Sequence, residues 1–290
     1  IKITNYRSNV FDTTTISSNR VWDIFVDNEN NVWVLNDRGV DLYNRANNDF
    51  VRFKTNSRPL HFSNLRDSLI VTTLQSGLLV IDKKTMATSL FSFDPLDPMS
   101  ISSSRFSDAQ TSPVSTKKNM AWVGTTNGLN RLNFSTKSAK RLYKEKSELV
   151  QRDTILAVLE IGSELLIGSS AGVMAHNEKN GETKQVISHH VNAIVNTHQD
   201  GTIMAMGKHR STLLDKDKNT LITIKHNTPK TEALYFGGNQ YILWSKEDFE
   251  IIMIEKENDR WTWETGLSPV IPEEILVDPE SNIWIASKNG

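Results

Sequence analysis

The sequence predicts an all-β protein: a seven-bladed β-propeller of four-stranded antiparallel blades, with residues 1–290 forming a single domain. Three observations predict this class. A strand–turn–strand unit that carries a tryptophan recurs at long, fairly even intervals. The polar residues between its strands are those of tight turns. Long apolar faces with a helical period are absent.

The recurring unit is clearest in three copies, at residues 32–39, 121–128 and 283–290. Each copy is a β-rich run followed by a polar turn and a glycine, which indicates a strand, a turn and the next strand. The anchor positions equivalent to the tryptophan are Trp33, Val71, Trp122, Leu166, Met204, Ile242 and Trp284. They are 38 to 51 residues apart, which fits the roughly 40–50 residues of a propeller blade.

The strands follow from these anchors in chain order. Blade one is expected to contain four strands, at residues 21–26, 32–35, 40–43 and 50–53. Asn, Asp and Gly separate them, because such turns need positive φ or side chains that bond to the local backbone. The strands expected in the other blades are 60–65, 69–74 and 77–81 (two), 155–161, 165–169 and 172–175 (four), 191–197 and 203–206 (five), 231–236 and 241–245 (six), and 274–277 and 283–286 (seven). Blade three carries the longest insertion, at residues 111–119.

The two ends of the chain bear on how the ring would close. Residues 15–21 align with residues 100–106, and by the same offset residues 1–6 match the outer strand expected at 86–91. We therefore expect the N-terminal strand to complete the last blade and remove an exposed sheet edge. The chain stops at Gly290, where the third strand of blade seven is expected. We expect that the natural polypeptide continues and that this chain is a fragment of it.

Composition excludes several classes of function. The 33 basic and 34 acidic residues leave a net charge of −1, so no overall field favours nucleic acid. The sequence has no cysteine, which excludes disulfides and thiolate metal sites. No apolar run approaches the roughly 20 residues needed to span a bilayer. The start of the chain reads as a strand rather than as a leader, so any signal peptide is expected to have been removed.

Three stretches carry a family resemblance. Residues 16–39, with Ile16 to Val21 followed by the Asp27 turn and Trp33, resemble a two-component regulator propeller repeat. Residues 122–132, from Trp122 to Leu132, are closer still to its motif, and residues 278–285 match its Asp–turn–strand part. Such repeats are typical of the periplasmic sensor regions of Bacteroides-type hybrid two-component systems.

The resemblance implies a function outside the inner membrane. It implies a periplasmic sensor module that detects an oligosaccharide and regulates polysaccharide utilisation. It further implies a second propeller, a β-sandwich and a homodimer in the full-length protein, which is expected to be a histidine kinase in a phosphorelay. The kinase domain would lie outside this chain, so no enzymatic activity is expected within it.

Basic residues recur just before the expected innermost strands. They are Arg20, Arg58, Arg105, Arg152, His190 and Lys230 in blades one to six. In a closed propeller these positions would converge at one mouth of the central channel, where guanidinium groups favour a carboxylate- or sulfate-bearing ligand. The alternative is that they are ordinary loop residues paired with Asp23, Asp108 and Asp153. The ligand hypothesis is therefore that these residues bind an oligosaccharide, and their positive charges add the alternative that it is anionic.

Other candidate residues favour structural roles. The repeated tryptophans invite a sugar-stacking interpretation, but their common place on the second strand favours packing between blades. Trp22, Trp261 and Trp263 break the repeat and are better candidates for exposure. The pair His189–His190 has no third ligand at suitable spacing, so we expect no metal and no cofactor. Glu273, Glu274 and Asp278 are not placed by any catalytic motif.

Two alternatives to the sensor remain open. One is a secreted propeller enzyme, such as a lyase acting on a polysaccharide or lactone. The other is a protein-interaction scaffold.

Overall fold

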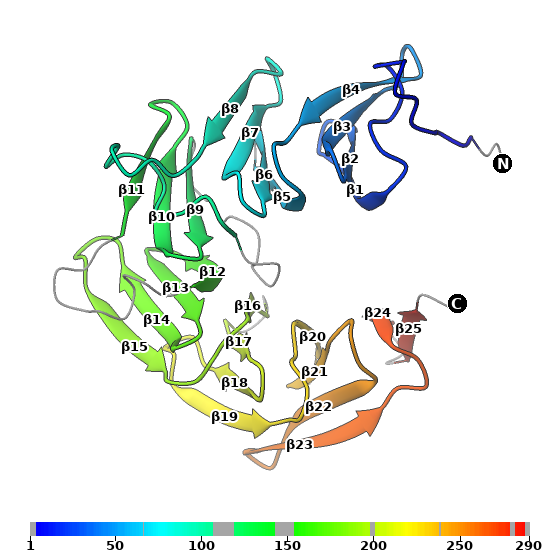
Figure 1. The fold of residues 1–290 in the computed structure, drawn as a ribbon. Coiled ribbons are helices and arrows are strands. Elements are labelled where there is room, and N and C mark those ends of the chain that lie inside the picture. The colour runs from blue at the N-terminus through cyan, green and yellow to red at the C-terminus, as the bar shows by residue number, and fades with distance from the viewer. Residues whose placement is uncertain are drawn as a thin grey trace. The chain divides into compact units, whose positions relative to one another are not determined.

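The computed structural model describes residues 4–65, 67–106, 119–142, 154–197, 201–237, 239–278 and 282–287. Within these ranges the chain forms strands β1 to β25 and no helix (Figure 1). The strands form seven sheets, and neighbouring strands within each sheet are consecutive in the chain. The all-β prediction is therefore confirmed, and seven sheets are consistent with seven blades. Across the same ranges, no helix is long and apolar enough to cross a membrane.

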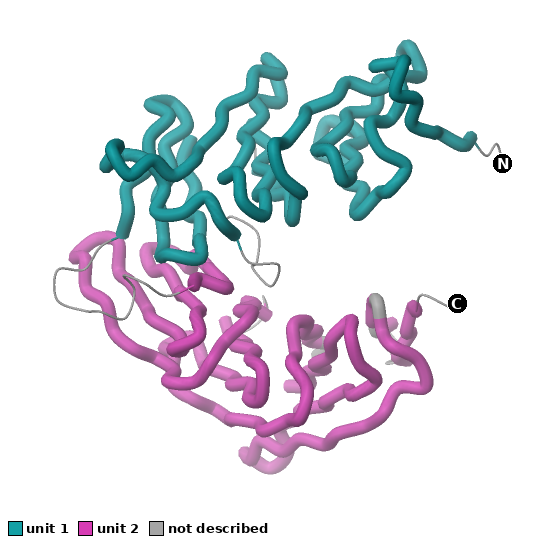
Figure 2. Tube along the Cα trace, viewed as in Figure 1, with its two compact units in different colours: residues 1–108, 112–152 teal, residues 109–111, 153–290 magenta. Residues whose placement is uncertain are grey.

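The chain divides into two compact units, which are coloured separately in Figure 2. Unit 1 is Ile1–Asp108 with Ser112–Arg152, and unit 2 is Ala109–Thr111 with Asp153–Gly290. Each unit consists of antiparallel sheets that pack on one another in chain order.

Unit 1 contains three sheets, which we call blades one to three. Blade one consists of β1 (Val21–Val26), β2 (Val32–Asn36), β3 (Gly39–Asn44) and β4 (Asp49–Lys54). Blade two consists of β5 (Pro59–Leu65), β6 (Ser68–Thr73), β7 (Leu78–Asp82) and β8 (Thr88–Phe91). Blade three consists of β9 (Met120–Thr125), β10 (Gly128–Asn133) and β11 (Ser138–Arg141). The strands predicted for blades one and two are confirmed to within two residues. Residues 111–118 of the predicted insertion lie outside the described residues.

Unit 2 contains four sheets, which we call blades four to seven. Blade four consists of β12 (Ile155–Ile161), β13 (Glu164–Ser169), β14 (Gly172–Asn177) and β15 (Thr183–Ile187). Blade five consists of β16 (Ala193–Asn196), β17 (Ile203–Met206), β18 (Arg210–Leu214) and β19 (Thr220–Lys225). Blade six consists of β20 (Glu232–Gly237), β21 (Gln240–Trp244), β22 (Glu250–Glu257) and β23 (Arg260–Leu267), and blade seven of β24 (Pro272–Val277) and β25 (Ile283–Ser287). Each strand predicted here is present, with ends that differ by at most two residues.

The core lies between successive sheets within each unit. In unit 1, the apolar face of blade one, with Trp33 and Val40, packs against Val71 and Ile81 of blade two. The other face of blade two packs against blade three. In unit 2 the same arrangement joins blades four and five, five and six, and six and seven. The buried positions alternate along β22, where Ile252 and Ile254 are buried, as expected for a strand with one face in a core.

The glycine at the end of the recurring unit is required by a close approach of the fourth strand. Gly39 has φ of +142°, and a Cβ atom there would lie 2.1 Å from the carbonyl oxygen of Phe53. The same holds in blade two, where a Cβ at Gly77 would lie 2.0 Å from the carbonyl oxygen of Phe91. A side chain at either position would push the fourth strand away, so the glycine is a packing requirement.

A carboxylate organises the turn that precedes the repeated tryptophan. Asp27 accepts hydrogen bonds from the backbone N–H of Asn31 at 2.9 Å and from the Trp33 indole Nε1–H at 3.0 Å. Asp278 does the same for Asn282 and Trp284, at 2.8 and 2.9 Å. The Asp–turn–strand unit is therefore a local hydrogen-bonded motif.

The repeated tryptophans do not share one environment. Trp33 and Trp122 are buried, as predicted. The prediction is wrong for Trp284, whose side chain is 63% exposed. In blade one the indole of Trp33 contacts the ring of Phe53 on the fourth strand, at 5.8 Å between centroids. The described part of blade seven has two strands, β24 and β25, and thus no fourth strand to cover Trp284.

The N-terminal segment also differs from the prediction. Residues 1–3 lie outside the described residues, and residues 4–6 are not part of any strand. Tyr6 instead lies against blade one, where its ring contacts Tyr43 and Phe50 at 5.5 and 5.3 Å. Its hydroxyl donates to Asn48 Oδ1 at 2.6 Å. For residues 4–6, the prediction of a strand that completes the last blade is therefore wrong. Aromatic packing holds this segment on blade one.

Candidate functional site

The basic positions predicted from the repeat share one local backbone structure. The N–H of Arg20 donates to Ser18 Oγ at 3.1 Å, and the N–H of Arg105 donates to Ser103 Oγ at 3.0 Å. In blade seven the N–H of Val270 donates to Ser268 Oγ at 3.3 Å. A serine two residues earlier thus forms the same turn in each loop. These bonds support the sequence alignment of the three loops.

These loops are also anchored to the second strand of their blade. The carbonyl of Arg58 accepts the N–H of Leu74 at 2.9 Å, and that of Arg105 accepts the N–H of Thr126 at 3.1 Å. Arg58 directly precedes β5, and the donors Leu74 and Thr126 directly follow β6 and β9. The side chains of Arg20, Arg58 and Arg105 are exposed. The backbone therefore fixes where each arginine leaves the sheet and leaves its side chain at the surface.

Two of these arginines meet at one aromatic ring. The guanidinium carbon of Arg20 lies 4.5 Å from the ring centroid of Trp22, and that of Arg58 lies 5.9 Å from it. Trp22 is 43% exposed, as the sequence suggested. Its Nε1–H donates to Asp37 Oδ1 at 2.9 Å, which fixes the orientation of the indole. The structure therefore brings Arg20, Trp22 and Arg58 together at the boundary of blades one and two.

A pocket of about 340 Å³ lies beside this ring. Trp22, Asp23 and Leu35 line it from blade one, and residues 58–61 line it from blade two. The indole offers an apolar face, the Asp23 carboxylate accepts hydrogen bonds, and the guanidinium of Arg58 binds anions. Sequence reasoning missed His61 and the role of Asp23. The signal that the sequence offered was an aromatic residue directly followed by a carboxylate, Trp22 and Asp23, in an expected strand.

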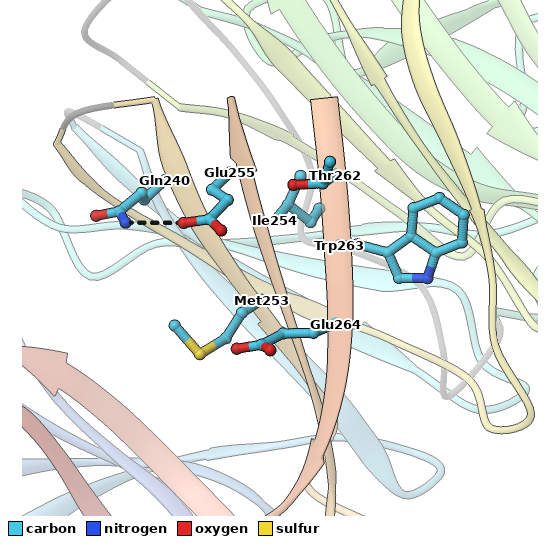
Figure 3. Close-up of a pocket in the computed structure, with 7 residues that line it drawn as sticks. All are labelled: Gln240, Met253, Ile254, Glu255, Thr262, Trp263 and Glu264. Carbon is cyan, nitrogen blue, oxygen red and sulfur yellow. Dashed lines mark hydrogen bonds between the residues drawn. The ribbon is translucent and has the colours of Figure 1, made fainter. Parts of the chain in front are cut away.

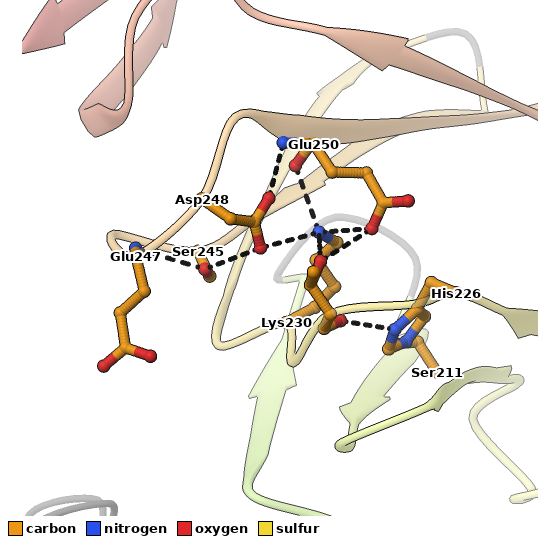
Figure 4. Close-up of polar contacts among 8 residues, drawn as sticks. Ser211, His226, Lys230, Ser245, Glu247, Asp248 and Glu250 are labelled. Carbon is orange, nitrogen blue, oxygen red and sulfur yellow. Dashed lines mark hydrogen bonds and ion pairs between the residues drawn. The ribbon is translucent and has the colours of Figure 1, made fainter.

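The prediction that Lys230 belongs to an exposed ligand site is wrong, because its side chain is buried. It lies in unit 2 and is fully buried. Its ammonium group donates to Thr228 Oγ1 at 2.7 Å and pairs with Glu250 Oε2 at 2.8 Å and Asp248 Oδ2 at 3.4 Å (Figure 4). It also donates to the carbonyl of Glu250 at 3.1 Å. These bonds engage the whole ammonium group within the protein.

The charges in this cluster stabilise one another. Burial alone would raise the pKa of Glu250, but hydrogen bonds from Lys230 and Thr228 and the charge of Lys230 hold it below its ordinary value. The pKa of Asp248 is lowered in the same way. Burial lowers the pKa of His226, which contacts Ser211 and the carbonyl of Thr228. The cluster is a structural ion-pair network at this position of blade six.

The remaining predicted positions are not among the residues that line the pocket beside Trp22. Arg105 is exposed in blade three. Arg152 lies outside the described residues. His190 is half-buried in unit 2, next to His189, whose Nε2 contacts Thr212 Oγ1 at 2.9 Å. Across the ranges that the structure describes, no group of three or more His, Cys, Asp or Glu residues could hold a metal ion.

The two tryptophans on β23, Trp261 and Trp263, lie in different environments. Trp261 packs on Tyr241 in the core, with 6.0 Å between ring centroids, while Trp263 is 47% exposed. On the opposite face of this sheet, Met253, Glu255 and Glu264 line a pocket of about 150 Å³ (Figure 3). This pocket is smaller than the one beside Trp22.

The family resemblance is supported at one repeat. Residues 15–38 match the family described as two component regulator propeller. This stretch is therefore similar to a two-component regulator propeller repeat. It contains β1 and β2 and therefore supplies Arg20, Trp22 and Asp37. No curated protein sequence matches the chain at a significant level.

Solved structures show the same fold. The extracellular domain assigned to a hybrid two component system of B. thetaiotaomicron superposes with a TM-score of 0.65 at 16% identity, over 94% of this chain and 39% of that one. A second such domain from the same organism gives 0.54 at 13% identity, over 98% and 50%. BamB from Moraxella catarrhalis gives 0.64 at 12% identity, over 91% and 81%. The chain thus has a β-propeller fold and spans at most half the length of these two extracellular domains.

Proposed function

We propose that this chain is a ligand-sensing module of the periplasmic region of a hybrid two-component sensor histidine kinase. The observation that carries the proposal is the match of residues 15–38 to the two component regulator propeller family. Fold similarity to extracellular domains of hybrid two-component systems supports it. The kinase, a second propeller and a β-sandwich belong to the proposed full-length protein, which acts as a homodimer.

The proposed ligand is an oligosaccharide, which the chain binds without transforming it, and the proposed output is regulation of polysaccharide utilisation. A sugar ring has apolar C–H faces that pack on an indole, and hydroxyls that need acceptors and donors. The pocket beside Trp22 offers both kinds of partner, in the indole itself and in Asp23. Ligand binding would signal by favouring one of two arrangements of the sensor dimer, which requires different affinities for the two.

Thermal unfolding with an oligosaccharide panel tests this function. A ligand at 100 times its Kd stabilises the folded state by about 2.7 kcal/mol. At roughly 2–4 °C per kcal/mol for a domain of this size, the midpoint should rise by about 5–10 °C. Chromatography of the recovered sugar should show it unchanged. A shortened or eliminated product would instead support the lyase alternative.

A second candidate function, the protein-interaction scaffold, is favoured by two exposed apolar tips in unit 1. The side chains of Phe11 and Leu96 are 96% and 91% exposed. Each is held by the same turn, with its N–H donating to Asn9 Oδ1 at 3.0 Å or Asp94 Oδ1 at 2.9 Å. Exposed apolar side chains contribute to contact surfaces, although single ones are also common on monomeric proteins.

Sedimentation velocity tests the scaffold as a self-associating one. An assembly of the chain that is lost in the Phe11→Ser, Leu96→Ser double variant would support it. A monomer at all concentrations in both proteins would argue against it.

A further inference from the structure

The cluster of Arg20, Trp22 and Arg58 has a more specific chemistry than an oligosaccharide site in general. We propose that the pocket beside Trp22 binds a sugar that carries an anionic group, a carboxylate or a sulfate, with the anion held by Arg20 and Arg58. This proposal rests on the proposed sensing function and names the ligand class of that same site.

The indole is a fixed platform. Trp22 lies on β1 at the irregular point of its pairing with β2, between Val21 and Asp23, both of which are paired with β2. The hydrogen bond from its Nε1–H to Asp37 Oδ1, 2.9 Å long, restrains the rotation of the ring. A ring that stays in place and remains partly exposed loses little conformational entropy when a ligand packs on it.

Arg20 is placed to bind an anion through its edge. Its guanidinium carbon lies 4.5 Å from the Trp22 centroid, so the charge is stabilised by the face of the ring. A guanidinium stacked on an indole keeps its N–H donors in the plane of the group, and the outer edge suits a carboxylate or sulfate. The turn at Ser18 fixes the backbone from which this side chain extends.

Arg58 brings a second positive charge to the same ring from another blade. Its guanidinium carbon lies 5.9 Å from the Trp22 centroid, and it lines the pocket together with Asp23 and His61. An anionic group in the pocket would feel both guanidinium charges. Asp23 would disfavour the anion nearby but can accept hydrogen bonds from sugar hydroxyls. This distribution favours a sugar that carries both hydroxyls and one negative group.

The other basic positions lack this combination. Arg105 occupies the same kind of turn, but the residue that corresponds to Trp22 in its loop is Ser107. Lys230 is fully buried and paired with Asp248 and Glu250. The aromatic platform with two guanidinium groups is thus found at the boundary of blades one and two, among the positions that the structure describes. Arg105 provides a matched control.

Isothermal titration calorimetry with three sugars tests the proposal. The probes are tri-galacturonic acid, its methyl ester, and a galacto-oligosaccharide sulfated at O6. The acid or the sulfated sugar should bind at least about tenfold more tightly than the uncharged methyl ester, since a hydrogen bond to a charged group is worth that much. The probe that binds identifies the carboxylate or the sulfate as the anion. Affinity should fall as salt is raised.

Variants locate the site. Arg20→Ala and Trp22→Ala should each weaken binding of the anionic probe by about 10- to 100-fold. Arg20→Lys should recover only part of the loss, because an ammonium group cannot form the bidentate contact. Arg105→Ala should bind as the unmodified chain does. Circular dichroism melting curves confirm that each variant is folded, and Trp22→Phe serves as a second, milder aromatic variant.

Three results would overturn the proposal. They are affinity of both anionic probes no greater than that of the methyl ester, no binding of either anionic probe, or full affinity in folded Arg20→Ala. If neutral oligosaccharides bind and stabilise the chain while any of these holds, the sensing function stands and the anionic site is wrong. If no oligosaccharide in the larger panel binds, the sensing function fails as well.

Discussion

Replacing Asp41 by Asn should stabilise the protein at neutral pH, because Asp41 is a buried carboxylate that is only half satisfied. It is 1% exposed on β3 of blade one. Its Oδ2 accepts the N–H of Ser17 at 2.6 Å and the Nδ2–H of Asn36 at 2.8 Å. Its Oδ1 is buried and has no hydrogen-bond partner in the described structure. An unsatisfied buried acceptor costs about 1–3 kcal/mol, and more when charged.

In blade three, the equivalent side chain has hydrogen-bond partners at both of its polar atoms. Asn130 occupies the equivalent position, and its Oδ1 accepts the N–H of Ser102 at 2.8 Å, as Asp41 Oδ2 does for Ser17. Its Nδ2 donates to Ser102 Oγ at 2.9 Å and to the carbonyl of Val123 at 3.4 Å. An asparagine at position 41 would place its donor where the unpartnered Oδ1 now lies. We expect Asp41→Asn to gain about 1–2 kcal/mol at pH 7, within the range for buried hydrogen bonds.

The gain should depend on pH in a defined direction. Burial raises the pKa of Asp41, although hydrogen bonds from Ser17 and Asn36 and the charge of Arg52 oppose the shift. Because the folded state binds this proton more tightly than the unfolded state does, its contribution is complete below the unfolded pKa of about 3.9. It is lost as pH rises through the folded pKa. The advantage of Asp41→Asn should therefore grow with pH and then level off.

Urea unfolding of both proteins over a pH series measures this difference. The reciprocal variant Asn130→Asp is the matched control, and it should destabilise blade three by a similar amount at pH 7. The reasoning is refuted if Asp41→Asn is less stable than the unmodified chain at pH 7, if its advantage does not change with pH, or if Asn130→Asp is neutral.

Three further predictions concern stability and are measured by the same unfolding experiment. Lys230→Met should cost about 3–5 kcal/mol, because it leaves two partly buried carboxylates without their cation, and a loss below 1 kcal/mol would contradict this. Gly39→Ala should cost at least about 2 kcal/mol, because its Cβ would clash with the fourth strand. Gly181→Ala, which also has positive φ but meets no atom within 4 Å, should cost only about 1–2 kcal/mol, and equal costs would argue against the clash. Trp33→Ala should cost about 3–5 kcal/mol, whereas the exposed Trp284→Ala should change stability by less than about 1 kcal/mol, and a large loss in the latter would show that Trp284 is covered in solution.

The local pattern of the chain could be predicted because it is set by neighbours in sequence. The strands follow from short runs of apolar and β-branched residues, and the turns from the Asp, Asn and Gly residues between them. The hydrogen bonds of Asp27 to Asn31 and Trp33 span at most six residues. The same is true of the serine turns before Arg20 and Arg105, which is why the repeat aligned these positions correctly.

The environment of each aligned residue was decided by contacts that are distant in sequence. Lys230 has the same position in the repeat as Arg20, but it lies in a buried ion-pair network. Its partners are Asp248, from the loop before β22, and Glu250, from β22 itself. Tyr6 reads as part of an outer strand, but Tyr43 and Phe50 hold it on blade one. A repeat fixes the backbone of each copy, whereas the side chains around it come from strands whose sequences have diverged.

The sequence by itself determined the fold class, the strands and the set of basic positions before the innermost strands. Only the tertiary structure decided which of these positions could form a site. It placed Arg20 and Arg58, which lie 38 residues apart in the chain, at one indole. The physical reason is that strand and turn formation depends on short-range backbone geometry. A binding site depends on which side chains from different blades meet at one surface.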